Sequence, residues 1–293
     1  MNFSRFFKRF FGCCCLLTVA ASLSAQDTIF YRGDTIRVGE LEWDMEKDYK
    51  GRGEALSSNT ELYGDSIRIY LRYYPNKMVE QILFGYLEGD AFVPHGPARF
   101  YYDSGHLLGK RYYQEGLLNG LAEDYFKNGQ RALATTFLDN QLEGTFTTYY
   151  ENGTVDQEGV YHHDTLMGWF NSFYNNGTQQ WVEYYDSSGW KQGRDSTFYE
   201  TGRLESTCEF TDDVEDGEAV FFHRNGRIWS RRTYQNGLLR SVEFIRNAQG
   251  KDLDVGSFSA GNGWVNVYND NGALIEREKF KHGTLVKVKR MRD

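Results

Sequence analysis

The chain contains little cysteine, with only 4 Cys among its 293 residues. Cys13, Cys14 and Cys15 stand together near the N-terminus, so Cys208 is alone in the remainder of the sequence. A single cysteine can form neither an intrachain disulfide nor a metal site built of several thiolates. Burial of side chains and pairing of backbone groups therefore have to hold the fold together.

Proline is equally scarce, and its 3 residues, Pro75, Pro94 and Pro97, all lie in the first third of the chain. Proline has no backbone N–H and interrupts the hydrogen bonds between strands. Its absence from Ala98 onward suits a long, uninterrupted β-sheet.

The chain also lacks an excess of positive charge, because 33 Lys and Arg stand against 41 Asp and Glu, a net charge of -8. Proteins that neutralise nucleic-acid phosphates carry the opposite balance. No glycine-rich phosphate loop or nucleophile elbow occurs in the sequence. We therefore predict no catalytic residues, no cofactor and no nucleic-acid partner.

The N-terminal segment has the features of a secretory signal peptide. Three basic residues between Arg5 and Arg9 precede an apolar run over 10–21, and small residues follow up to Ala25. The run is too short to span a membrane. We expect residues 1–25 to be removed, with cleavage one residue earlier as the alternative. The mature chain would then lie in the periplasm, at the cell envelope or outside the cell, without a membrane span.

Glycine and aromatic residues are abundant, with 31 Gly, 21 Phe and 21 Tyr, and they recur at a period of 24 or 25 residues. The glycines that open successive units are Gly96, Gly120, Gly144, Gly168, Gly193, Gly217 and, after a degenerate stretch, Gly263. A second glycine follows nine residues later at Gly105, Gly129, Gly153, Gly177, Gly202, Gly226 and Gly272. Aromatic residues stand five and seventeen positions after each opening glycine. Such a period is typical of repeat architectures.

Each unit has the sequence of a β-hairpin. Asn-Gly pairs between aromatic-rich runs, such as Asn152-Gly153, are a strong hairpin signal. A three-residue loop over 151–153, with Gly153 in the left-handed conformation, would place Tyr149 opposite Val155. Pro75-Asn76 indicates an atypical first unit, and a leading hairpin is expected over 29–38.

A second turn, centred near Met167, would set Tyr161 opposite Phe173 of the next unit. The fifth, eleventh and seventeenth positions after each opening glycine would then share one face, which we call the aromatic stripe. A single sheet with one apolar face must bury that face, either by curling on itself or against a partner. We expect internal burial for most of the stripe, because exposed aromatic residues promote aggregation.

The predicted fold is therefore all-β, with tandem hairpin repeats of about 24 residues forming an elongated, twisted or curled antiparallel sheet. Its expected parts are the signal peptide 1–25, a β lead-in or cap 26–67, the repeats 68–288 and a basic tail 289–293.

The repeat pattern resembles the bacterial variant of the MORN repeat. The resemblance rests on Tyr149-Tyr150-Glu151-Asn152-Gly153 followed by Tyr161, and on its counterparts over roughly residues 68–288. It implies paired strands used as an interaction scaffold and no catalytic residues. Some bacterial relatives are labelled antitoxin-like, so an antitoxin-like role is one of the functions that the resemblance implies.

The pair His162-His163 suggests a metal ligand set, because imidazole nitrogens bind transition metals. Neighbouring residues on a strand point to opposite faces of the sheet. We therefore expect no metal site at this pair.

Two functional classes remain. The first is an exported scaffold that binds a protein, since repeat sheets present extended surfaces. The alternative is a glycan-binding module, in which exposed aromatic rings stack on sugars. The candidate binding residues are Tyr102, Tyr150, Tyr174, Tyr199, Trp169, Trp181 and Trp190.

Overall fold

The computed structural model describes residues 68–76 and 78–291, together with the backbone of four earlier strands. The chain divides into two compact units, Met1–Leu142 and Glu143–Asp293. The described residues form strands and turns without any helix, so they include no helix that could cross a membrane. The predicted signal peptide and most of the lead-in lie outside the described residues.

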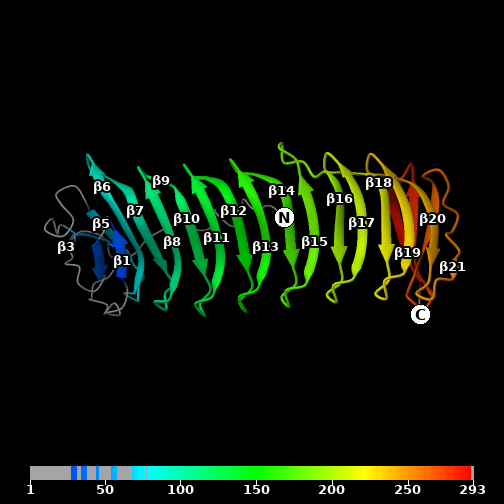
Figure 1. Ribbon diagram of the computed structural model, residues 1–293, viewed down its shortest axis with the longest axis horizontal. Coiled ribbons are helices and arrows are strands. Elements are labelled where there is room, and N and C mark those ends of the chain that lie inside the picture. Colours follow the sequence, from blue (N-terminus) through cyan, green and yellow to red (C-terminus); the bar gives the residue numbers. More distant parts are fainter. Residues whose placement is uncertain are drawn as a thin grey trace. The chain divides into compact units, whose positions relative to one another are not determined.

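The first unit is a series of antiparallel strands (Figure 1). The early strands are β1 (Thr28–Tyr31), β2 (Asp34–Arg37), β3 (Asp44–Met45) and β4 (Glu54–Ser57). They are followed by β5 (Arg68–Tyr73), β6 (Val79–Glu88), β7 (Ala91–Tyr101), β8 (Leu107–Gln114), β9 (Leu117–Leu118), β10 (Gly120–Tyr125) and β11 (Arg131–Leu138). Strands β5, β6, β7 and β8 pair in chain order, and β8 and β11 flank β10. The predicted leading hairpin is confirmed, since β1 pairs with β2.

The second unit continues the same pattern. Its strands are β12 (Gln141–Tyr149, which begins in the first unit), β13 (Val155–His162), β14 (Thr165–Phe173), β15 (Gln179–Tyr185), β16 (Gly193–Phe198), β17 (Leu204–Thr211), β18 (Val214–Phe222), β19 (Ile228–Gln235), β20 (Leu238–Arg246), β21 (Asp252–Leu253), β22 (Gly263–Tyr268), β23 (Leu274–Lys281) and β24 (Thr284–Arg290). Strands β12 to β21 pair antiparallel with their neighbours in chain order, whereas β22, β23 and β24 form a separate sheet. The prediction of tandem antiparallel hairpins is therefore confirmed.

The Asn-Gly loops have the predicted three-residue form. Tyr149 pairs with Val155, the N–H of Tyr150 donates to the carbonyl of Thr154 at 2.9 Å, and Gly153 has a φ of 85°. The same bond closes the atypical first loop, where the N–H of Tyr74 donates to the carbonyl of Met78 at 2.8 Å. Positive φ strains a side chain with a Cβ atom, so glycine suits the third loop position.

The second turn of each unit differs from the prediction. His162 pairs with Thr165 and Tyr161 with Leu166, so the turn consists of His163 and Asp164 and does not centre near Met167. Tyr161 therefore does not lie opposite Phe173, which pairs with Gln179. Both turn residues have positive φ, 48° for His163 and 63° for Asp164, as two-residue hairpin turns of type I′ require.

A bulge also divides the predicted aromatic stripe. The register of β12 and β13 shifts at Tyr149, and Gly144 pairs with Tyr161. Positions 144 and 149 are an odd number of residues apart on one strand and so face opposite sides of the sheet. Tyr161 consequently lies on the opposite face from Tyr149 and Val155, and the prediction that the three positions share one face is wrong.

The more deeply buried face carries the residue two positions after the opening glycine. The buried residues at this position are Ala98, Ala122, Phe146, Phe170, Ala219 and Val265. Phe146 lies on the face of Tyr161, and the two rings meet edge to face with their centroids 5.5 Å apart. We call this face the inner face. It also carries Phe137 and Phe280, which are buried and which stand at the seventeenth position of the predicted stripe.

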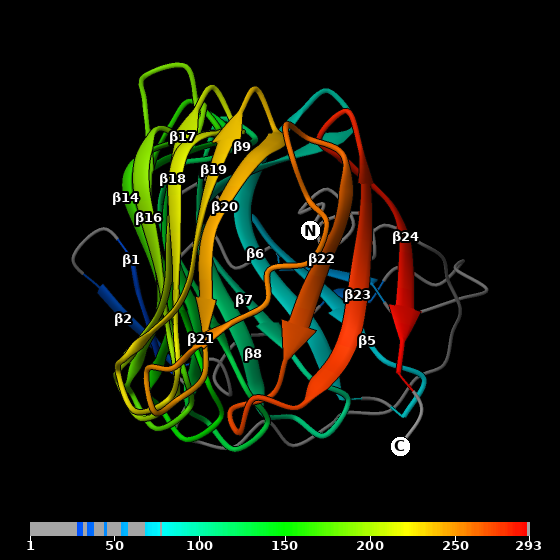
Figure 2. The same ribbon diagram turned by 90° about the vertical axis from the view of Figure 1, so that its right-hand side faces the viewer.

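The degenerate repeat over about 241–262 marks the place where the second unit changes sheet. After β21 the chain leaves the long sheet and returns as β22–β24, which face β20 in Figure 2. Leu239, Ile245, Val265 and Phe280 form a buried cluster between the two layers. The predicted internal burial is therefore realised at this end of the second unit by a folded-back sheet.

Candidate functional site

A series of tyrosine hydroxyl groups links each hairpin to the next. The tyrosine six positions after an opening glycine donates its hydroxyl hydrogen to a carbonyl of the following hairpin. These bonds are Tyr102 to Tyr125 (2.9 Å), Tyr150 to Phe173 (2.7 Å), Tyr174 to Phe198 (2.8 Å) and Tyr199 to Phe222 (2.6 Å). Burial raises the pKa of Tyr150 to about 12, so its hydroxyl keeps the proton that it donates at neutral pH. We call these bonds the tyrosine rungs.

The asparagine of the Asn-Gly pair connects hairpins in the same direction. The side-chain oxygen of Asn152 accepts the N–H of Thr154 at 3.0 Å, which closes its own loop. The side-chain nitrogen of Asn152 donates to the carbonyl of Asn175 in the next loop at 2.7 Å. Asn225 makes the equivalent bond to Ala248 at 2.7 Å. Asparagine therefore suits this position for two reasons. Its side chain closes its own turn, and it also bonds to the backbone of the next loop.

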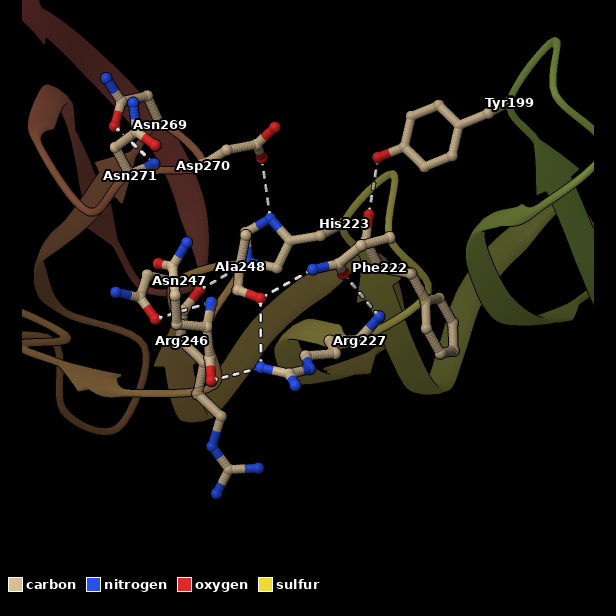
Figure 3. A network of polar contacts seen from close by, with 12 residues as sticks. Tyr199, Phe222, His223, Arg227, Arg246, Asn247, Ala248, Asn269, Asp270 and Asn271 are labelled. Carbon is tan, nitrogen blue, oxygen red and sulfur yellow. Dashed lines mark hydrogen bonds and ion pairs between the residues drawn. The ribbon is translucent and has the colours of Figure 1, made fainter.

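His223 takes the place of the tyrosine in one rung (Figure 3). Its Nε2 is 2.8 Å from the carbonyl oxygen of Arg246, in the position that a tyrosine hydroxyl occupies elsewhere. Its Nδ1 is 2.8 Å from Oδ1 of Asp270, which belongs to the loop between β22 and β23. His223 is only 4% exposed. This one side chain thus connects the long sheet of the second unit to the folded-back sheet.

We expect Tyr174→Phe to lower the free energy of unfolding by about 0.5–1.5 kcal/mol, because it removes one rung and leaves the ring in place. Tyr184→Phe is the control, since Tyr184 is exposed on the neighbouring strand. Denaturant unfolding of the two variants measures the difference. Equal midpoints for both would mean that the rung does not contribute to stability.

The rungs define what the four predicted tyrosines can offer to a ligand. Tyr102, Tyr150, Tyr174 and Tyr199 are half-buried, and their hydroxyl groups already serve the backbone of the next hairpin. Only the edges and faces of their rings remain for contact with a partner.

The three predicted tryptophans lie in different surroundings. Trp181 is half-buried and pairs with Ser172, whereas Trp169 is 58% exposed and Trp190 is 49% exposed. Trp169 pairs across the strands with Tyr184, and their rings meet edge to face at 5.1 Å. We call Trp169 and Tyr184 the exposed aromatic pair. The sequence did not single out Tyr184.

The exposed aromatic pair occupies two positions that face each other across the strands in the repeat. Trp169 is one residue and Tyr184 is sixteen residues after the opening glycine, Gly168. In the first unit these positions expose Tyr112 and Leu121, and in the second they expose Val160. The next hairpin of the second unit places an ion pair there, with Nη2 of Arg194 2.7 Å from Oε1 of Glu209. Charged side chains therefore replace the exposed apolar ones at the hairpin that follows the exposed aromatic pair.

Glu143, His162 and His163 meet at the end of one hairpin of the second unit. Oε1 of Glu143 is 2.8 Å from Nδ1 of His162, and its Oε2 accepts the N–H of His163 at 3.0 Å. Nδ1 of His163 is 3.1 Å from Nε2 of His162. The hydrogen bond from the N–H of His163, followed by the one from His162, lowers the pKa of Glu143 and keeps its carboxylate ionised.

The argument from strand alternation therefore does not apply to this histidine pair. His162 ends strand β13, but His163 begins the turn with positive φ, so its side chain does not follow the alternation of the strand. The imidazole rings consequently approach each other, with centroids 4.2 Å apart. The turn conformation was the missing information.

Cys208 is half-buried and chemically protected. Burial, followed by the nearby carboxylates of Glu215 and Asp195, raises the pKa of its thiol to about 12. The reactive form of cysteine is the thiolate, so this residue is a poor nucleophile at neutral pH.

Polar pairs lie among the apolar side chains of the inner face, which sequence analysis did not predict. In the first unit Arg111 is 2.6 Å from Asp124, and in the second Lys191 is 3.0 Å from Glu183. The ammonium group of Lys191 also lies 3.7 Å from the centre of the Phe210 ring. The inner face thus combines aromatic rings with half-buried ion pairs.

Three stretches of the chain match the model of the MORN repeat variant, at residues 94–115, 142–163 and 215–236. Each stretch begins two residues before an opening glycine and ends at the first residue of a two-residue turn. A matched stretch therefore corresponds to one structural hairpin with its three-residue loop. A search of the curated proteins found no matching relative.

The matched stretches share their three-residue loop and their bulge with the other hairpins of the same chain. Their agreement in length and in position supports a protein built from repeats of the MORN variant.

Proposed function

We propose that this protein is a non-catalytic, exported repeat scaffold that binds another protein through the exposed aromatic pair of the second unit. MORN repeats are consistent with an interaction scaffold of this kind. The observation that carries the proposal is the 58% exposure of Trp169 beside Tyr184. Tryptophan and tyrosine dominate the binding energy of many protein interfaces, whereas a cross-strand aromatic pair adds only about 0.2–1 kcal/mol to stability.

The setting of the exposed aromatic pair also favours recognition. Both residues lie on paired strands, Trp169 on β14 and Tyr184 on β15, and not on mobile loop tips. Side chains held by a sheet lose little conformational freedom when a partner binds. The charged pair Arg194–Glu209 on the following hairpin supplies a polar boundary, as the rim of an interface requires.

Export is part of the proposal and rests on the sequence of residues 1–25. The basic, apolar and small-residue regions of that segment are typical of a signal peptide. N-terminal sequencing of the processed protein should find Gln26 at or near its start. A protein that keeps Met1 after full processing in the cell would contradict export.

The experiment that tests the binding surface compares two variants at the same position of the repeat. Trp169→Ala should abolish capture of the cellular partner, whereas Leu121→Ala should retain it, because Leu121 is equally exposed in the first unit. Both variants should melt like the parent protein. If Trp169→Ala captures the same partner with unchanged yield, the exposed aromatic pair is not the binding surface.

Glycan binding is the second candidate, and the same exposed rings favour it. Trp169 and Trp190 are exposed rings of the kind that stack on sugars. Asp186 lies close to Trp190, since its carboxylate accepts the backbone N–H of Trp190 at 3.0 Å, and it would serve as a hydrogen-bond acceptor for sugar hydroxyl groups. Capture that survives glycosidase treatment supports a protein partner, and capture that free sugar competes away supports a glycan. The antitoxin-like role that the resemblance implies stays a prediction.

A further inference from the structure

The histidine pair at the end of strand β13 goes beyond what the scaffold function requires. In other hairpins the residue before the opening glycine also accepts the first N–H of the two-residue turn. Oδ1 of Asn262 accepts the N–H of His282 at 3.1 Å, and Oδ1 of Asp216 accepts the N–H of Asn236 at 3.4 Å. The turn therefore explains why one oxygen of Glu143 accepts the N–H of His163. It does not explain why two imidazole rings lie beside the same carboxylate.

The turn at His282 is a natural comparison for the turn at His163. Both histidines begin a two-residue turn, with a φ of 51° for His282 and 48° for His163. The turn at His282 has Asn262 in place of the glutamate and Lys281 in place of the first histidine. The same backbone therefore occurs once with a set of metal-binding side chains and once without it.

We propose that Glu143, His162 and His163 form a binding site for a divalent transition-metal ion of the Zn²⁺ class. Each residue offers one ligand atom, and the three atoms lie within 4.8 Å of one another. Ligand atoms of a tetrahedral Zn²⁺ site are about 3.3 Å apart, because each bond is about 2.0–2.1 Å long. The 3.1 Å between Nδ1 of His163 and Nε2 of His162 is close to that separation.

The ligand types select the class of ion. Two imidazole nitrogens and one carboxylate suit Zn²⁺, Cu²⁺ or Ni²⁺, whereas Ca²⁺ and Mg²⁺ prefer sites made of oxygen atoms. The ionised carboxylate of Glu143 supplies the negative charge that a divalent cation needs, and its 3.8 Å distance from Nδ1 of His163 allows it to share an ion with that ring.

The exposure of the site determines what it can do. The side chains of His162 and His163 are 57% and 55% exposed, so an ion bound by them remains accessible from solvent. Three protein ligands leave a tetrahedral ion with one open position for water or for a donor atom of another molecule. The site is thus suited to reversible binding rather than to a closed structural role.

Calorimetric titration with Zn²⁺ of the full chain, in which serine replaces its 4 Cys so that no thiol can bind the ion, tests the proposal. The protein should bind one Zn²⁺ ion. The affinity should fall at least about tenfold in His162→Gln and in His163→Gln, since even the outer partners of metal ligands contribute about tenfold or more to affinity. Glu143→Gln should weaken binding as well, although the Gln side-chain oxygen can still accept the N–H of His163.

His282→Gln is the matched control and should bind Zn²⁺ like the parent chain. Thermal melting of Glu143→Gln should coincide with that of the parent chain in the absence of Zn²⁺, which separates metal binding from folding. Absence of Zn²⁺ binding by the parent chain, or equal affinity in the His162→Gln, His163→Gln double variant, would overturn the proposal.

Discussion

Phe146→Ala is expected to lower the free energy of unfolding by about 3–5 kcal/mol, because truncating a buried Phe removes apolar burial and leaves a cavity. Phe146 is only 6% exposed and packs edge to face against Tyr161. It lies opposite Gly159, which has no side chain that could move into the cavity. Denaturant unfolding followed by tyrosine and tryptophan fluorescence measures the change.

Trp169→Ala is the control for this prediction, because it also removes a large aromatic ring from the second unit. Trp169 is 58% exposed, so its loss should change the free energy of unfolding by less than about 1 kcal/mol. Similar losses in the two variants would mean that the assignment of an inner face and an outer face is wrong.

His223→Phe should be the second most damaging of the substitutions, with an expected loss of about 1–3 kcal/mol. Phenylalanine fills a similar volume but forms no hydrogen bond with the carbonyl of Arg246 or with the carboxylate of Asp270. The bond to Arg246 should account for most of the loss, since the side chain of Asp270 is 63% exposed and water can replace its partner.

The location of the effect distinguishes His223 from an ordinary buried residue. Amide hydrogen exchange should become faster in β22 and β23, because His223 connects them to the long sheet, while exchange in β12 to β14 should stay unchanged. His106→Phe, at an exposed position of another loop, should alter neither region. Uniformly faster exchange across the second unit would contradict a local connecting role for His223.

The hairpins and their three-residue loops could be predicted because their determinants are local. A glycine with positive φ and an asparagine beside it identify the loop that contains Gly153 without knowledge of the remaining chain. The aromatic period gave the number and order of the hairpins for the same reason.

The two-residue turn at His163-Asp164 and the bulge beside Tyr149 were not predicted, because neither contains a glycine that marks it in the sequence. His163 adopts positive φ although it is not glycine, and Glu143, 20 residues earlier, accepts its N–H. The extra residue of the bulge beside Tyr149 then reverses the facing of every later position on β13. An argument from alternation alone therefore placed Tyr161 on the wrong face and separated His162 from His163.

The candidate binding residues illustrate the same limit. The sequence predicted the exposed Trp169 and the half-buried Tyr150 alike as binding residues, because both are aromatic residues between turns. The hydroxyl of Tyr150 has its acceptor at Phe173, 23 residues later, and no local pattern reveals that bond.

The tyrosine rungs have a consequence for the order in which the chain folds. Each rung joins a donor to an acceptor only 23 or 24 residues later, so every newly synthesised hairpin finds its hydroxyl donor in the hairpin made just before it. Contacts between residues so near in sequence form quickly, because little chain entropy is lost when they close. Removal or duplication of one whole repeat would leave each remaining donor with an acceptor at the same spacing. The length of such a protein can therefore change during evolution by whole hairpins, without redesign of the hairpins that stay.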